Sequence, residues 1–446
     1  MRIAITVLAA VVFIFSNGCK QPAQSEDLLR ESSIKTVTGQ QPAEAQAEIP
    51  AFEQPRGELT LEQAAAATLL NNPKLKAFAL DKRISEAREL QAAAPPNPEL
   101  GVEIENFGGS GDYNSFDSAE TTFELSRIIE LGGKLEKRKN AASLDTELAD
   151  LEYQSAKLEV LTELAIAYID TAAMQKKALM LDELVKLADS VHVSVSKQVQ
   201  AGKGTAVDTA KAAIEAASAK MEHQQALRQL EYSKKLLASY WAADEPLFDS
   251  VKADFKVDGQ LPDFEKLRGL MRNSPRLLKL QTEITKSKAV ADMEKAYSKP
   301  DITISGGVKM FNDTNDSAFV VGISIPLPVS DINRGKRLEA AHNLAKSYEL
   351  QRQQQIETGN VFNEIQANLT NSLSTAMELA DNILPQTQQI LDASQKAYTE
   401  GKAGYMEVLD TQRMYLEKQT EYIEAASQYH KSVALIEGVT GQVLEK

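Results

Sequence analysis

The sequence offers few residues whose types and spacing suggest chemistry. Its four histidines, His192, His223, His342 and His430, are scattered, and none has a Cys or another His at the spacing of a metal site. It contains neither a nucleophile elbow nor a phosphate-binding glycine loop. The glycine-rich "GGSG" (108–111) follows a strand pattern without opening a helix, which favours a hairpin loop. The sequence therefore predicts a protein that is not an enzyme and that has no metal site and no cofactor.

The acidic residues of greatest interest follow two glycine-containing turns. After "EGKAG", Glu407 and Asp410 stand three apart and therefore share one face of a predicted helix. After "AGKG", Thr205 and Asp208 fit a capping box, in which each side chain bonds the backbone N–H of the other residue. Glu407 has the equivalent place after Gly404, so capping explains one acid of the second turn but not both. The glycines that permit the two chain reversals are Gly202, Gly204, Gly401 and Gly404.

The N-terminal residues predict an exported chain. Arg2 precedes a 14-residue apolar run that ends in "SNGC", a length typical of a signal peptide and short for a membrane-spanning helix. We expect residues 1–19 to be a signal peptide with a lipobox-like end, where Cys19, the sole cysteine, is lipidated. The alternative is ordinary cleavage nearby, which leaves a free thiol. Residues 20–57 have no apolar period and predict a flexible tether.

Charge and hydropathy exclude two further classes. The formal net charge is −14 and no basic stripe occurs, which argues against nucleic acid as a partner. After the signal no run of about 18 apolar residues occurs, so any membrane crossing must use strands.

The chain contains an internal repeat. Pro73 in "NNPKLKAFAL" and Pro275 in "NSPRLLKLQT" are 202 residues apart, as are Pro98 and Pro300. The segment "TFELS" matches "VVGIS" 198 residues later, and the two glycine turns correspond at an offset of 199. We therefore expect a tandem duplication. The first repeat is predicted over 58–250, the second over 251–441, and a tail over 442–446.

The sequence of each repeat predicts, in this order, a helix, two strands, a very long helix and a further helix. The predicted helices are 60–94, 134–200 and 205–241, then 263–297, 334–400 and 404–438. The predicted strands are 98–107 and 119–129, then 300–310 and 317–328. A helix of 67 residues is about 100 Å long and needs a partner along its whole side, as in coiled coils. The helices alone also fit a periplasmic coiled-coil scaffold without a pore.

The strands favour a membrane protein. Ile302, Ile304 and Val308 alternate with polar or small residues, as do Leu100 and Val102 in the first repeat. Strands of about 9–11 residues with one apolar face are typical of transmembrane barrels, of which the smallest have about eight strands. Four strands must therefore join those of other copies, because open edges in lipid are costly. A small four-stranded cap on a helical rod is the alternative. The expected fold class is mainly α with a membrane β-barrel portion.

The sequence resembles the TolC family of bacterial outer-membrane efflux factors over about 57–441. The duplicated plan carries this resemblance, and "PNPEL", "IEN", "ETTFELS" and "ELGGK" are similar to its heavy-metal cation efflux (CzcC/CusC-like) branch. The resemblance implies a homotrimer with a 12-stranded barrel in outer-membrane lipid and helices extending into the periplasm. It implies a periplasmic adaptor and an inner-membrane pump of the resistance-nodulation-division type as partners. The expected function is a passive exit duct for heavy-metal cations, with a duct for drugs or secreted proteins as the alternative.

The resemblance also assigns roles to the turns. Glu407 and Asp410 fall on acids that ring the periplasmic mouth of the channel, and six such carboxylates in a trimer would favour cations. Asp208 falls on an acid that ties the closed tips together. The family's basic partner for that acid is replaced by Ala403, which leaves Lys402 or Lys203 as candidates for the bridge. The tips expected to dock the adaptor contain Gly202, Gly204, Thr205, Gly401 and Gly404.

Overall fold

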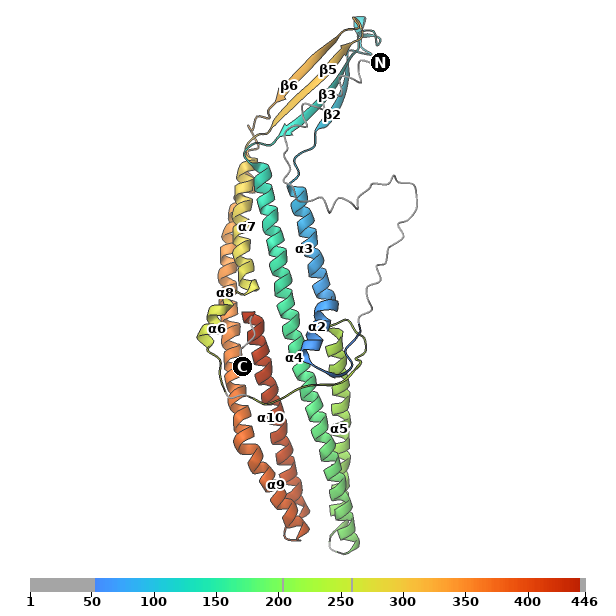
Figure 1. Cartoon of the computed structure of the whole chain (residues 1–446), viewed down its shortest axis with the longest axis vertical. Coiled ribbons are helices and arrows are strands. Elements are labelled where there is room, and N and C mark those ends of the chain that lie inside the picture. Colours follow the sequence, from blue (N-terminus) through green and yellow to red (C-terminus); the bar gives the residue numbers. More distant parts are fainter. Residues whose placement is uncertain (1–52, 203, 258–259, 442–446) are drawn as a thin grey trace. The chain divides into compact units, whose positions relative to one another are not determined.

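The computed structural model describes residues 53–202, 204–257 and 260–441. The predicted signal peptide with Cys19, most of the tether, Lys203 and the C-terminal tail lie outside these residues. The described part of the chain is mainly helical and contains two β-sheets. Figure 1 labels the helices and the four strands of the larger sheet.

Nine α-helices are distributed over the two repeats within the described residues. The first repeat contains α2 (Leu61–Asn71), α3 (Pro73–Ala92), α4 (Lys134–Gln200) and α5 (Ala206–Ser239). The second contains α6 (Phe264–Met271), α7 (Pro275–Tyr297), α8 (Arg334–Glu378), α9 (Leu384–Thr399) and α10 (Tyr405–Thr440). The predicted helix over 134–200 is confirmed as α4, which has 67 residues.

The structure interrupts three helices that the sequence predicts as continuous, namely 60–94, 263–297 and 334–400. Pro73 begins α3 after Asn72, whose side chain accepts a bond from the N–H of Leu75 at 3.2 Å. Pro275 likewise begins α7. Pro385 lies in the first turn of α9, directly after a π-helical turn over Leu379–Ile383. Proline has no N–H for the helical ladder, so each interruption coincides with a position where that bond is missing.

The larger sheet contains four antiparallel strands in the order β2-β3-β5-β6. These are β2 (Glu99–Glu105), β3 (Glu120–Ile129), β5 (Ile302–Phe311) and β6 (Ser317–Ser324). The ladder places Val102 opposite Phe123, Phe123 opposite Val308, and Val308 opposite Phe319. One apolar face therefore runs across all four strands, and Phe319 is 81% exposed on it.

The opposite face of this sheet is polar. On it the Nζ of Lys309 lies 2.8 Å from a carboxylate oxygen of Glu105 and 2.7 Å from one of Glu120. The two-faced pattern predicted from the sequence is thus present in the folded sheet. Its outer strands, β2 and β6, each pair with only one other strand.

A polar junction joins the sheet to the helices. Lys134, at the start of α4, is buried and lies 2.7 Å from Asp301, which directly precedes β5. The N–H of Leu131 donates to the same carboxylate at 2.9 Å. Arg138 binds Glu130 at 2.7 Å, one helical turn further along. Because Asp301 belongs to the second repeat and Lys134 to the first, the junction also ties the repeats together.

A small parallel sheet was not predicted from the sequence. It pairs β1 (Gly57–Leu59), whose first residue was expected in the tether, with β4 (Phe248–Val251) at the join of the repeats. Gln175 of α4 exchanges two hydrogen bonds of 3.0 Å with the backbone of Val251. Tyr168 of α4 is buried against the same sheet, and burial raises its pKa to about 12. The signal for such short strands is weak because three or four residues carry no clear period.

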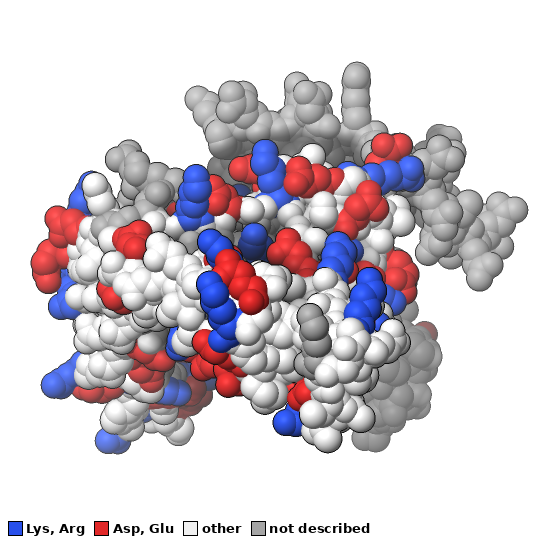
Figure 2. Space-filling view, turned by 90° about the horizontal axis from the view of Figure 1, so that it is seen from below, with Lys and Arg blue, Asp and Glu red and all other residues white. Residues whose placement is uncertain are grey.

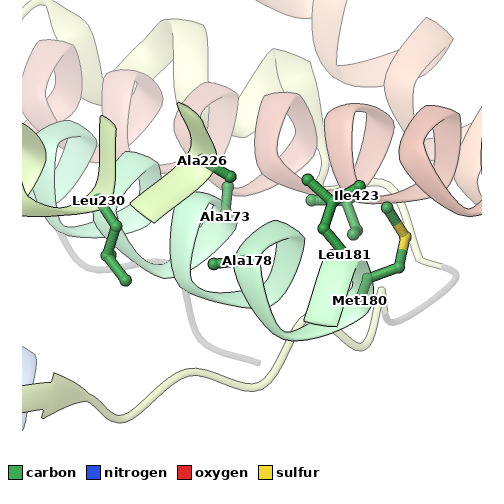
Figure 3. Packing of buried hydrophobic residues seen from close by; sticks show 7 residues of the cluster. All are labelled: Ala173, Ala178, Met180, Leu181, Ala226, Leu230 and Ile423. Carbon is green, nitrogen blue, oxygen red and sulfur yellow. The ribbon is translucent and has the colours of Figure 1, made fainter. Parts of the chain in front are cut away.

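The long helices pack through small side chains. Figure 3 shows one cluster, in which residues of α4 and α5 lie beside Ile423 of α10. Its buried members are Ala173, Ala178, Met180, Leu181, Ala226, Leu230 and Ile423. Further along, a Cβ on Gly438 of α10 would clash with the side chain of Thr162 in α4. The two helices therefore approach each other too closely there for any larger residue.

This close approach gives a test of the packing. We expect Gly438→Ala to lower the free energy of unfolding by about 1–3 kcal/mol, as overpacking does. The matched change Gly359→Ala in α8, where a Cβ meets nothing within 4 Å, should instead stabilise by about 0.5–1 kcal/mol. Thermal unfolding of the detergent-solubilised protein, followed by circular dichroism, measures both. Stabilisation by both variants would contradict the close α4–α10 contact.

Candidate functional site at the ends of the two helical hairpins

The first hairpin joins α4 to α5 through a short turn. α4 ends at Gln200, and Gly202 then takes a left-handed φ of 72°, which glycine adopts without steric cost. Thr205 is the N-cap of α5. Gly204 precedes it and lies against Val199 of α4. The predicted reversal is therefore present between the two helices.

The predicted capping box of this turn is present. The hydroxyl and the N–H of Thr205 donate to the Asp208 carboxylate at 2.7 and 3.0 Å, and the N–H of Asp208 donates to the Thr205 hydroxyl at 3.3 Å. Two hydrogen bonds hold the pKa of Asp208 below its ordinary value: the larger effect comes from the Thr205 side chain and the smaller from the Thr205 backbone N–H. The carboxylate is thus engaged within its own turn.

The second hairpin joins α9 to α10 by a similar turn. Gly401 again takes a φ of 72°, and Gly404 is the N-cap of α10. Lys402 forms an ion pair of 2.6 Å with Glu400 of the same turn, and it does not bridge to Asp208. The candidate bridge from Asp208 to Lys402 is therefore absent within the single chain and stays a prediction, and Lys203 lies outside the described residues.

Glu407 and Asp410 differ from Asp208 in having no polar partner among the described residues. Both side chains are exposed on α10, whose N-terminus has no side-chain cap. The buried face of the same turns contains Tyr405, Val408 and Leu409. The two acids therefore point away from the packed side of the hairpin, and Glu407 does not act as a cap.

Two polar contacts that the sequence did not predict connect the hairpins. The hydroxyl of Tyr398 in α9 donates to the side chain of Gln198 in α4 at 3.2 Å. Arg413 of α10 forms an ion pair with Glu215 of α5. Each contact joins residues 198 or 200 positions apart, close to the repeat offset. Nearly equivalent positions of the two repeats thus face each other. The repeat offset in the sequence is therefore the signal that could have suggested both pairs.

An apolar cluster lies behind these contacts and includes all four helices. Val195 of α4, Ala212 of α5, and Tyr405 and Leu409 of α10 are buried together, with Tyr398 of α9 packed against them. Burial raises the pKa of Tyr405 to about 12, and Glu215 adds to this effect. The hairpin ends are thus held together by packing as well as by polar contacts.

The charges at this end of the chain are mixed. Figure 2, which views the chain from below, shows Lys and Arg side chains interspersed with Asp and Glu. No group of three or more His, Cys, Asp or Glu side chains within the described segments could hold a metal ion. None of the helices in those segments is long and apolar enough to cross a bilayer.

The fold is that of outer-membrane channel proteins. A crystal structure of CusC, described in terms of transmembrane channel formation, matches 88% of this chain and 96% of its own with a TM-score of 0.72 at 16% identity. The chain belongs to the outer membrane efflux protein family, whose profile matches residues 65–243 and 267–442. The predicted TolC-like fold and efflux family are thereby confirmed, and the protein is one of the outer membrane.

The chain is similar over most of its length to two relatives whose names indicate different roles. The cobalt-zinc-cadmium resistance protein CzcC of Cupriavidus metallidurans is 27% identical over 386 residues, which cover 86% of this chain and 91% of that protein. The pyoverdine export outer membrane protein OpmQ of Pseudomonas putida is 22% identical over 399 residues, which cover 83% of each chain.

The capping box predicts a local loss of order on substitution. Thr205→Ala removes the cap, so backbone amides of residues 206–208 should exchange about fivefold faster, equivalent to roughly 1 kcal/mol. The control Val207→Ala changes the same exposed turn without touching the cap. Because the pKa of Asp208 is lowered by folding, its contribution is complete above about pH 4 and is lost as the pH falls through the folded value. Hydrogen exchange measured across this range checks both points, and a wild-type advantage that persists unchanged at pH 2 would contradict them.

Proposed function

We propose that three copies of the chain form an outer-membrane channel that is the exit duct of a tripartite efflux system. One observation carries this proposal: the four-stranded sheet has a continuous apolar face and two unpaired edges. Unpaired backbone groups in hydrocarbon cost several kcal/mol each, so such a sheet is stable in lipid only when its edges are joined to other strands.

The number of copies follows from strand arithmetic and from the family resemblance. One chain supplies four strands, and known bacterial barrels begin at about eight. Two copies would reach that minimum, whereas the TolC-like plan favours three copies and twelve strands. The long helices of three copies would then surround a water-filled passage on one side of the membrane.

The hairpin ends are proposed as the gate and as the docking site of a periplasmic adaptor. Glu407 and Asp410 are exposed and unpartnered, so a trimer would place six free carboxylates around the passage, which favours cations. Asp208 contributes by fixing the start of α5. The adaptor is proposed to contact the turn residues Gly202, Gly204, Thr205, Gly401 and Gly404. Opening would separate the hairpins and break the Tyr398–Gln198 and Arg413–Glu215 contacts.

Heavy-metal cations are the proposed cargo. The relative CzcC is a cobalt-zinc-cadmium resistance protein and matches more of the chain at higher identity than the pyoverdine exporter does. The exposed carboxylates of Glu407 and Asp410 at the hairpin ends are compatible with cations. An inner-membrane pump of the resistance-nodulation-division type would supply the energy, and a lipid on Cys19 would add an accessory anchor. The alternative cargo is a larger organic compound, because one relative is a pyoverdine export protein.

Planar-bilayer recording tests the channel and its selectivity together. We expect the wild-type protein to conduct and to prefer cations. Glu407→Gln with Asp410→Asn should reduce the cation-to-anion permeability ratio roughly two- to tenfold, because fixed charge concentrates counter-ions. The control Glu417→Gln with Glu424→Gln removes two acids further along α10 and should have a smaller effect. Absence of conductance would favour the pore-free scaffold, and unchanged selectivity would remove the gate role of the two acids.

Growth of a deletion strain tests the cargo. Loss of the gene should lower tolerance to salts of cobalt, zinc or cadmium, and plasmid-borne wild-type protein should restore it. A panel of drugs and siderophores serves as the comparison. Unchanged metal tolerance together with lost tolerance to organic compounds would replace the metal proposal by the alternative.

A further inference from the structure

One charged side chain lies on the apolar face of the four-stranded sheet. The ladders place Arg127 of β3 opposite Ile304 of β5, and Ile304 opposite Ile323 of β6. Because side chains alternate along a strand, Arg127 is on the same face as Phe123. Every other paired position on this face of the described strands holds an uncharged residue. The arginine is therefore an exception that the two-faced pattern does not explain.

The side chain of Arg127 is exposed and unpaired. It has no ion-pair or hydrogen-bond partner among the described residues, whereas Lys309 on the opposite face binds two glutamates. The ladder with β2 ends where Glu99 lies opposite Ser126, so no paired residue of β2 lies beside Arg127. β3 itself lies between β2 and β5, away from the two edges of the sheet. The guanidinium is therefore open to the medium that surrounds the apolar face.

Arg127 lies near the end of the apolar face that borders the helices. Only one paired row, that of Ile129 and Ile302, separates it from Glu130 at the polar junction, whereas three rows separate it from the loop at the other end. Two residues along a strand cover about 7 Å, which an extended arginine spans while its stem stays on apolar surface. At this level the guanidinium reaches the boundary between hydrocarbon and headgroups, where a charge on the lipid face of a barrel costs little.

Further unpaired bases lie at the same end of the sheet, where α4 and α8 begin. In the first two turns of these helices, several basic side chains are exposed or half-buried and have no ion-pair partner within the described segments. They are Lys137, Lys139, Arg334, Lys336 and Arg337. The acids of the same turns are Glu136 and Glu339. The starts of the two helices are therefore net basic, which complements anionic headgroups.

We propose that the guanidinium of Arg127 binds the phosphate of a phospholipid in the leaflet that borders the helices, and that the basic starts of α4 and α8 give this site a preference for anionic headgroups. The planar guanidinium donates two parallel N–H bonds to a phosphate. Ile304 and Ile323, in the same row, contact the acyl chains. The inference rests on the proposed channel, because the sheet must lie in lipid, and it adds a lipid-binding residue to the sheet.

Lipid titration of the full-length protein in detergent tests the site. Phosphatidylglycerol and phosphatidylcholine are added to the wild type and to Arg127→Gln, and bound lipid is measured by native mass spectrometry. We expect the wild type to prefer phosphatidylglycerol, and Arg127→Gln to weaken this binding about fivefold, the effect of one basic side chain at a lipid surface. The control Arg228→Gln removes an exposed arginine of α5 that is also unpaired among the described residues, and it should leave lipid binding unchanged.

A relocated charge tests the level of the site. Ile129→Arg, added to Arg127→Gln, returns a guanidinium one row nearer to the junction and should restore most of the lipid binding. Leu125→Arg, added to the same variant, places the guanidinium one row further away and should restore less. Circular dichroism identifies the variants that fold as the wild type does. Among those, equal restoration by both changes, or by neither, would contradict the assigned level.

The outcomes separate this inference from the proposed channel. Unchanged binding of phosphatidylglycerol by Arg127→Gln, in a protein that still conducts, would overturn the lipid site and leave the channel standing. An equal loss in Arg228→Gln would also overturn it, because net charge alone would explain the effect. Displacement of the lipid by inorganic phosphate would assign the arginine to free phosphate instead. A wild-type protein that neither binds lipid nor conducts would overturn the proposed function as well.

Discussion

The unpaired backbone N–H and C=O groups at the two edges of the larger, four-stranded sheet are the constraint on which the rest of this molecule depends. β2 and β6 each satisfy only one side of their backbone within the chain. In water the free side would be solvated, but the sheet also has an apolar face running across all four strands, which favours lipid. In the proposed channel a single copy is therefore incomplete, because the N–H and C=O groups at these two edges need partners from other copies.

The long helices are stabilised in a different way, by packing of small side chains along their length. A rod of 67 residues has a large surface and no globular core, so it is stabilised by neighbours along its length. Alanine and glycine allow those neighbours to come close, as the Ala173–Ala226 cluster and the Gly438–Thr162 contact show. The hairpin ends then add the Tyr405 cluster and two polar contacts between repeats.

Local patterns in the sequence were sufficient for much of this architecture. The period of two in β5, the capping box at Thr205 and the uninterrupted run of α4 are visible in neighbouring residues, and the structure contains all three. Proline positions were visible too, but the sequence alone did not show that a π-turn before Pro385 separates α8 from α9. The β1–β4 pairing and the Arg413–Glu215 contact were missed because they join distant segments, and no local period reports such contacts.

The interruption at Leu379–Ile383 makes the two helical hairpins mechanically unequal. α4 continues without a break from the sheet junction to its turn. The path from α8 to α9 contains a π-turn followed by Pro385, so the helical hydrogen-bond ladder is interrupted at one place, where helices commonly kink. In a ring of copies, helical hairpins with this interruption would alternate with hairpins that lack it. Widening of the passage would then require bending of only one of the two hairpins in each copy.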